Sequence, residues 1–197
     1  MAEEALGFLG GRFDPVHWGH IWLARDALKQ FGLSSVYLIP SEQTPLKGSN
    51  PGAPVRDRWA MLELAVGEDI PKIQLLDWEL EQGGAVYTYD TACYLQERWP
   101  KAKLYWILGM DQLAQLDAWY RIEELAAMVE FICSDRPGYE QVIIPGIPGL
   151  KLHRLHGHYL DMSSTALRQG LQSGESMDFC LPPGVSNYIQ VHNLYKK

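Results

Sequence analysis

The chain has 197 residues, of which 47% are hydrophobic and 21% are charged, a composition typical of one globular domain with a substantial core. The formal net charge of −7 excludes a general nucleic-acid binder, which would present a basic face, but it permits a local positive cleft for a small polyanion. No apolar run approaches the ~20 residues of a membrane span, and residues 1–4 are acidic where a signal peptide would be basic, so we expect a cytoplasmic protein.

The N-terminal segment predicts a strand, a glycine turn and a helix in succession. Residues 5–9 are an apolar run, residues 10–20 read GGRFDPVHWGH, and residues 21–31 have an amphipathic pattern. The apolar stripe of this helix would consist of Ile21, Ala24, Leu28 and Phe31. A strand that enters a helix through glycines forms an anion site, because free backbone N–H groups and the helix dipole face the ligand.

Two histidines stand at the start of this helix. His17 and His20 are three residues apart, so both side chains lie on one face of the first turn, with Gly19 between them. Two imidazoles beside an anion site indicate phosphoryl or nucleotidyl transfer, because positioned donors stabilise the charge spread over the transferred group.

Strands and helices then alternate along the chain. Strands are expected at residues 33–40, 72–76, 104–108, 129–133 and 150–155. Helices are expected at residues 55–67, 88–99, 122–127, 164–172 and 184–194, with a short helix that ends at residues 119–120. Loops are expected at residues 41–54 and 80–87. This alternation predicts the α/β class, with a doubly wound, mostly parallel sheet in a single domain of residues 1–197.

Three segments should meet at one edge of the sheet. The glycine turn at residues 10–11, the loop at residues 41–48 and the segment at residues 109–111 each follow a strand. In a doubly wound sheet the ligand binds outside the carboxyl ends of the strands, where the strand order reverses.

A second phosphate clamp is predicted near the other end of the sequence. Residues 162–168 read MSSTALR, so Ser164 or Thr165 stands where a helix cap belongs, and Arg168 lies one turn along the same face. Hydroxyl groups, free N–H groups and a guanidinium together bind phosphate well. In the middle of the chain, Thr88 or Asp90 could cap a helix, and Trp119 by itself is typical of a core residue.

Both clamps resemble elements of one known family. Residues 10–20 resemble the signature G-G-x-F-D-P-x-H-x-G-H of nucleotidyltransferases, specifically the nicotinate-nucleotide adenylyltransferases, and residues 162–168 resemble their I-S-S-T-x-x-R element. Residues 109–119 are similar to the family's G-x-D-x-L-x-x-L-x-x-W, and residues 86–91 to its S-Y-T-x-D-T. The matches run from Gly10 to Tyr195.

The resemblance implies a Rossmann-like nucleotidyltransferase fold and an activity. AMP would pass from ATP to nicotinate mononucleotide, which gives nicotinate adenine dinucleotide and pyrophosphate in NAD biosynthesis. The acceptor phosphate has its second pKa near ~6 and needs no general base. Mg²⁺ would be the cofactor, carried with ATP and without protein ligands. The partners would be ATP and nicotinate mononucleotide, with no nucleic acid and no membrane, and a homo-oligomer stays open.

The resemblance also assigns site residues. The catalytic residues would be His17, His20 and Arg168. ATP would be bound by Gly10, Gly11, Arg12, Phe13, His17, His20, Gly109, Asp111, Arg136, Ser164, Thr165 and Arg168. Nicotinate mononucleotide would be bound by Lys47, Thr88 and Trp119, whose indole ring would stack on the pyridine ring. Asp14-Pro15 is interpreted as turn chemistry.

Two positions depart from the family pattern and leave alternatives open. Leu46 replaces the histidine of a P-H-K element, so Lys47 would act alone, and Gln82 stands where relatives often carry arginine. The acceptor could instead be nicotinamide mononucleotide or phosphopantetheine, and a non-catalytic nucleotide-binding module is a further alternative. A dinucleotide-dependent oxidoreductase and a P-loop kinase are disfavoured, because their glycine motifs are absent.

His153, His156 and His158 suggest a metal site at first sight. No fourth ligand follows at a recognisable spacing, so we interpret them as histidines at the surface end of a strand.

Overall fold

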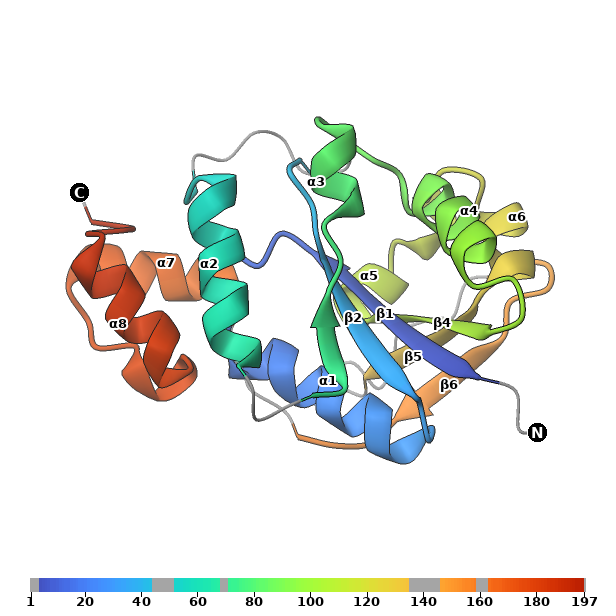
Figure 1. Cartoon of the computed structure of the whole chain (residues 1–197), viewed down its shortest axis with the longest axis horizontal. Helices are drawn as coiled ribbons and strands as arrows, with labels where there is room; N and C mark the ends of the chain where they lie inside the picture. Colours follow the sequence, from blue (N-terminus) through green and yellow to red (C-terminus); the bar gives the residue numbers. More distant parts are fainter. Residues whose placement is uncertain (1–3, 44–51, 68–70, 135–145, 159–162, 197) are drawn as a thin grey trace.

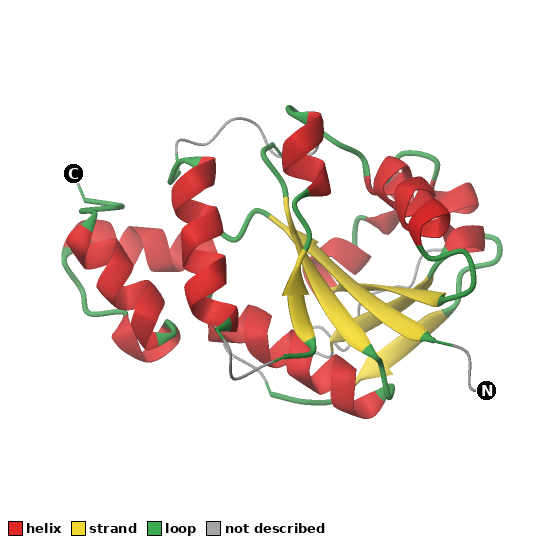
Figure 2. Cartoon of the chain, viewed as in Figure 1, coloured by secondary structure: helices red, strands yellow, loops and turns green. Residues whose placement is uncertain are grey.

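The centre of the molecule is a parallel β-sheet with helices on both faces (Figures 1 and 2). The computed structural model describes residues 4–43, 52–67, 71–134, 146–158 and 163–196. Within these residues, six strands pair in the order β3-β2-β1-β4-β5-β6, and every pair is parallel. The strands are β1 (Ala5–Gly11), β2 (Ser35–Pro40), β3 (Ile73–Leu75), β4 (Lys103–Leu108), β5 (Glu130–Ser134) and β6 (Leu152–Leu155). The predicted α/β class and doubly wound parallel sheet are confirmed.

Each face of the sheet is covered by its own group of helices, because successive strand residues point to opposite faces. Leu9 and Ile107 belong to the core beneath one group, and Phe8 and Trp106 belong to the core beneath the other. The first group is α1 (Trp18–Gln30) and α2 (Val55–Val66), together with α7 (Ser164–Ser173) and α8 (Pro183–Val191), which share their core; α8 packs mainly against α2. The second is α3 (Trp78–Gln82), α4 (Thr88–Arg98), α5 (Met110–Leu113) and α6 (Ile122–Met128). None of the helices in the described part of the chain is both long and apolar enough to cross a membrane.

Helix α1 begins earlier than the hydrophobic pattern predicts. It begins at Trp18, three residues before Ile21, so His17 is its N-cap and His20 lies in its first turn. Ile21 and Ala24 are buried as expected, but the stripe continues through Ala27. Leu28 and Phe31, which were expected on that stripe, are only partly buried against the core.

Helix α3 was not predicted, because residues 80–87 were expected to form a loop. Five residues are too short to show a helical period, and tertiary contacts hold them in place. The rings of Trp78 and Tyr94 stack with centroids 4.6 Å apart, and the Thr91 hydroxyl donates to Glu79 over 2.7 Å. The short helix expected to end near residue 119 is also divided, into α5 and a 3₁₀ turn over Leu116–Ala118.

The strand order reverses between β1 and β4, and this reversal positions the site. Gly11 at the end of β1 is in register with Pro40 at the end of β2, and the N–H of Ser41 donates to the carbonyl of Gly11 over 3.0 Å. β4 ends at Leu108, directly before Gly109. The expected glycine turn is instead the last part of β1, which includes Gly10 and Gly11. This end of β1, the described start of the loop at residue 41 and the segment from residue 109 share one edge of the sheet, as predicted.

The middle of β1 has room only for glycine. A Cβ atom on Gly7 would lie 2.8 Å from Leu33 Cδ1, 2.9 Å from Val36 Cγ2 and 3.0 Å from Ile107 Cδ1.

We expect Gly7→Ala to lower the free energy of unfolding by about 1–3 kcal/mol, the usual cost of overpacking a tight core. Urea denaturation measures this change. Gly146→Ala is the control, because no atom of the described residues lies within 4 Å of its added Cβ. Equal unfolding midpoints for the two variants would contradict the expectation.

Candidate active site

The two histidines of the glycine-rich segment lie together where β1 passes into α1. Their ring centroids are 3.8 Å apart, and the edge of the Phe13 ring approaches the His20 ring with centroids 4.9 Å apart. The backbone N–H of His17 donates to His20 Nδ1 over 3.3 Å. Neutral His20 therefore carries its proton on Nε2, which remains a donor for a ligand.

Burial keeps both imidazoles uncharged at neutral pH. It lowers the pKa of His17 to about 4. The pKa of His20 also lies well below its usual value, first because of burial and second because of the neighbouring His17. His17 Nδ1 is buried and has no hydrogen-bond partner among the described residues. Such an atom costs roughly 1–3 kcal/mol when it stays unpaired, which is typical of a site that a ligand completes.

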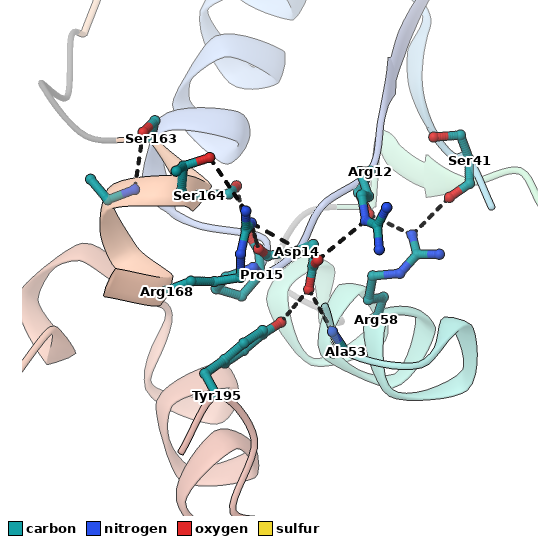
Figure 3. A network of polar contacts seen from close by, with 12 residues as sticks. Arg12, Asp14, Pro15, Ser41, Ala53, Arg58, Ser163, Ser164, Arg168 and Tyr195 are labelled. Carbon is teal, nitrogen blue, oxygen red and sulfur yellow. Dashed lines mark hydrogen bonds and ion pairs between the residues drawn. The ribbon is translucent and has the colours of Figure 1, made fainter. Parts of the chain in front are cut away.

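The second clamp contacts the first directly. The Ser164 hydroxyl donates to the carbonyl of Pro15 over 3.0 Å, and Arg168 Nη1 donates to the carbonyl of Asp14 over 2.6 Å (Figure 3). The two motifs are about 150 residues apart in sequence and share one contact surface. The two motifs therefore converge on one loop. The cap was assigned wrongly, however: Ser163, not Ser164 or Thr165, is the N-cap and accepts from the N–H of Ala166. Ser164 and Thr165 are therefore the first residues of α7, and their hydroxyls serve other contacts.

Asp14 is the centre of the polar network in Figure 3. Its side chain is only 2% exposed and lies between three structural elements. Arg12 Nε donates to Oδ2 over 3.2 Å, and Arg168 Nη1 lies 3.9 Å from the same oxygen. The N–H of Ala53 and the hydroxyl of Tyr195 donate to Oδ1 over 3.0 and 2.7 Å. The interpretation of Asp14 as simple turn chemistry was incomplete, because the carboxylate joins the loop after β1 to the segment before α2, to α7 and to the segment after α8.

Arg58 holds the loops that follow β1 and β2. It is 1% exposed, and its Nη1 donates to the carbonyls of Arg12 and Ser41 over 2.6 and 2.8 Å. Burial is the main reason why its pKa is lowered, and the neighbouring Arg12 adds to the effect. The sequence did give a signal for this residue, since Arg58 precedes the buried Met61 and Leu62 at helical spacing on the buried face of α2.

Two further predicted elements meet each other on the face of the sheet that carries the second core. Thr88 is the first residue of α4, and its helix is capped by Tyr87, so neither Thr88 nor Asp90 is the N-cap. The rings of Tyr87 and Tyr120 lie with centroids 4.7 Å apart, which brings the Thr88 segment next to Trp119. Trp119 is partly buried and packs against the core of that face.

Glycines allow close packing at two points of the site. A Cβ atom on Gly10 would lie 2.7 Å from the Trp106 ring, and one on Gly109 would lie 2.8 Å from Asp111 Oδ1. Gly109 is the N-cap of α5, and Asp111 is exposed beside it. The absence of a side chain at residue 109 therefore makes room for the carboxylate that the resemblance assigns to ATP.

Comparison with known proteins identifies the family. The family model described as cytidylyltransferase-like matches residues 8–170. A relative from Opitutus terrae, described as a probable nicotinate-nucleotide adenylyltransferase, is 44% identical over 97% of this chain and 97% of its own. A Synechococcus relative with the same description is 36% identical over 99% of this chain and 98% of its own. The chain belongs to the nicotinate-nucleotide adenylyltransferase family.

Solved structures of the family share the fold. The nicotinic acid mononucleotide adenylyltransferase of Plasmodium falciparum, complexed with NaAD, superposes with a TM-score of 0.80 at 21% identity and covers 98% of this chain and 97% of its own. The same Plasmodium protein complexed with APC gives a TM-score of 0.79 at 20% identity and the same coverage. The expected Rossmann-like fold of a nicotinate-nucleotide adenylyltransferase is thus confirmed.

The residues assigned to this adenylyltransferase site fall into three groups. One group surrounds the loop after β1: Gly10, Gly11, Arg12, Phe13, His17, His20, Ser164, Thr165 and Arg168. A second group lies at the starts of α4 and α5 and after the 3₁₀ turn: Thr88, Gly109, Asp111 and Trp119. Lys47 and Arg136 form the third group, together with the departure at Leu46, and lie outside the described residues.

The histidines near β6 do not form a metal centre in the described part of the chain. His153 Nε2 lies 2.7 Å from Glu130 Oε2, and His158 Nδ1 lies 3.1 Å from Asp26 Oδ1. No group of three or more His, Cys, Asp or Glu side chains gathers for a metal within those residues.

The low pKa of His17 has a measurable consequence. In a nuclear magnetic resonance titration of the free protein, we expect the His17 imidazole to stay neutral until the pH approaches about 4. The unfolded chain binds the same proton near pH ~6.5, so the free energy of unfolding should fall as the pH is lowered from 6.5 towards 4. His17→Asn should reduce that fall. A His17 titration midpoint near 6.5 would contradict the conclusion that burial lowers the pKa of His17.

Proposed function

We propose that this protein transfers AMP from ATP to the phosphate of nicotinate mononucleotide, forming nicotinate adenine dinucleotide and releasing pyrophosphate. The observation that carries the proposal is the contact of the two phosphate clamps, in which Ser164 and Arg168 of α7 bind the backbone of the loop that leads into His17 and His20. One triphosphate can then reach both the histidine pair and the start of α7. The relatives' shared description supports the same reaction.

In the proposed reaction, an oxygen of the mononucleotide phosphate attacks the α-phosphorus of ATP. The new O–P bond forms as the bond from the α-phosphorus to the bridging oxygen breaks, and pyrophosphate leaves with the bonding electrons. The nucleophile has its second pKa near ~6 and is largely anionic at neutral pH, so no residue has to remove a proton. Catalysis therefore consists of alignment and stabilisation of charge.

The chain's own groups divide this work by position. The neutral imidazoles of His17 and His20 donate N–H hydrogen bonds to the α-phosphate and, unlike imidazolium ions, need no compensating charge when buried. Arg168, the Thr165 hydroxyl and the backbone N–H of Ser164 hold the β- and γ-phosphates, because the Ser164 hydroxyl already donates to Pro15 and the first N–H groups of α7 have no partners within the helix. Arg168 is the charged member of this set, and its guanidinium suits the oxygens of the leaving pyrophosphate.

Mg²⁺ enters this scheme as part of the nucleotide substrate. Asp14 is the buried carboxylate nearest to the clamps, and its oxygens already accept from Arg12, Ala53 and Tyr195. Mg²⁺ commonly binds phosphate oxygens and several waters, with few protein ligands. The site therefore suits an ion held by the triphosphate, where it neutralises part of the charge.

The acceptor side is proposed from two adjacent elements. The start of α4 presents Thr88 and backbone N–H groups, which suit a carboxylate. Trp119 stands next to this segment through the Tyr87–Tyr120 contact and offers an aromatic face to a pyridine ring. A carboxylate and a flat ring together describe nicotinate better than the flexible arm of phosphopantetheine.

Loss of one imidazole should impair the chemical step more than binding. We expect His20→Ala to lower kcat about 100-fold, the usual size for removal of one positioned donor, while ATP still binds. Pyrophosphate release measures kcat, and calorimetry with a non-hydrolysable ATP analogue measures binding. His153→Ala is the control, because His153 pairs with Glu130 at the amino-terminal edge of the sheet, away from the clamps. A near-normal kcat for His20→Ala would refute the role of the histidine pair.

The identity of the AMP acceptor is tested by comparing three candidate acceptors in the same assay. We expect pyrophosphate release from ATP and Mg²⁺ with nicotinate mononucleotide to be at least about tenfold more efficient, in kcat/KM, than with nicotinamide mononucleotide, because a carboxylate makes charge-assisted hydrogen bonds that an amide does not. Phosphopantetheine should give no release above background. Thr88→Val should reduce the preference for the acid. Equal efficiency with acid and amide would overturn the assigned acceptor, and release only with phosphopantetheine would overturn the pyridine site.

A further inference from the structure

The segment after α8 reaches the centre of the active-site network. The Tyr195 hydroxyl donates to Asp14 Oδ1 over 2.7 Å, across 181 positions of sequence (Figure 3). The ring itself is partly buried and packs against the core beneath α1, α2, α7 and α8. Burial raises the pKa of the phenol above its usual range, and the nearby Asp14 carboxylate raises it further. The hydroxyl therefore stays protonated and always acts as a donor to Asp14.

The two oxygens of Asp14 serve different partners. Oδ1 accepts from Tyr195 and from the N–H of Ala53, and Oδ2 accepts from Arg12 Nε. Arg168 Nη1 lies 3.9 Å from Oδ2, which is an ion-pair distance but too long for a hydrogen bond. The two donors to Oδ1 fix the orientation of the Asp14 carboxylate. They also occupy Oδ1, so this oxygen is not available as a hydrogen-bond acceptor for Arg168.

This arrangement orients the Arg168 guanidinium but leaves its positive charge without a close, hydrogen-bonded carboxylate. Its Nη1 donates to the carbonyl of Asp14, and its Nη2 donates to the Thr165 hydroxyl over 3.3 Å. A guanidinium has five N–H donors in a rigid plane, so donors remain for a phosphate. A carboxylate free to rotate could instead form a bidentate pair with Arg168 and compete with the triphosphate.

We propose that Tyr195 is a positioning residue for ATP, which fixes the Asp14 carboxylate so that the Arg168 guanidinium stays available to the β- and γ-phosphates. The inference rests on the proposed function for the role of Arg168, but it concerns nucleotide binding and can be measured without any acceptor. It gives the segment after α8 a part in the site that the sequence motifs do not assign.

Tyr195→Phe tests the inference by removing one hydroxyl and keeping the ring. We expect it to raise the dissociation constant of a non-hydrolysable ATP analogue, and to lower kcat/KM for ATP, each about tenfold, the size expected for one lost hydrogen bond to a charged group. The KM for nicotinate mononucleotide should change by less than about twofold, because the contacts of Tyr195 are with the clamps.

Tyr188→Phe is the matched control. Tyr188 also donates to a carboxylate, Asp57 Oδ1 over 2.9 Å, and joins α8 to α2. This variant loses the same kind of bond and should keep the ATP affinity of the unchanged protein. If Tyr195 only anchors its own segment, Tyr195→Phe will behave like Tyr188→Phe, with a lower melting temperature and unchanged ATP affinity, and the proposal is overturned.

A double-mutant cycle shows whether Tyr195 acts through Arg168. In an Arg168→Ala background, Tyr195→Phe should change the affinity for the ATP analogue by less than about twofold, because coupled residues are not additive. A tenfold loss in that background would overturn the proposal. If the unchanged protein binds the analogue and Tyr195→Phe weakens it, but no acceptor releases pyrophosphate, then the proposed function fails and the positioning role stands.

Discussion

The loop between β1 and α1 depends on buried hydrogen bonds from side chains, because the sheet itself cannot pair its backbone. Beyond the ends of β1 and β2, carbonyl and N–H groups that stay buried without partners would cost roughly 1–3 kcal/mol each. Arg58 satisfies the carbonyl of Arg12 in this loop and that of Ser41 after β2, and Asp14 satisfies the N–H of Ala53 before α2. The loop is thus tied to the segments after β2 and before α2.

The charges around this loop differ from those of the whole protein. The chain has a formal net charge of −7, yet three arginines lie around this loop. Arg12 and Arg168 pair with the buried carboxylate of Asp14, whereas Arg58 donates to backbone carbonyls. The two imidazoles add donors without adding positive charge, since burial lowers both pKa values. Donors fixed in advance need no reorganisation during the reaction, which is the main source of electrostatic catalysis. A local excess of guanidinium groups is enough to attract a polyanion to an acidic protein.

The sequence predicted the parts of the fold that local patterns determine. Apolar runs predicted all the strands of the described sheet, and two short motifs predicted the phosphate clamps that meet in the structure. Helix α3 escaped prediction because its five residues depend on contacts such as Trp78 with Tyr94. The partners of Asp14 also escaped, since Ala53 and Tyr195 are 39 and 181 positions away and no spacing rule connects them. Arg58 could have been found, because it lies on the apolar stripe of α2, whereas Arg56 has an 87% exposed side chain.

The contact between α7 and the loop after β1 is more sensitive to mutation on the side of the helix than on the side of the loop. Ser164 and Arg168 donate to the backbone oxygens of Pro15 and Asp14, not to their side chains. Every amino acid supplies such an oxygen, so replacement of a loop side chain leaves these acceptors in place. Apart from Asp14, whose carboxylate also pairs with Arg168, loop side chains can therefore vary without removing these acceptors, whereas a single change at Ser164 or Arg168 removes a donor.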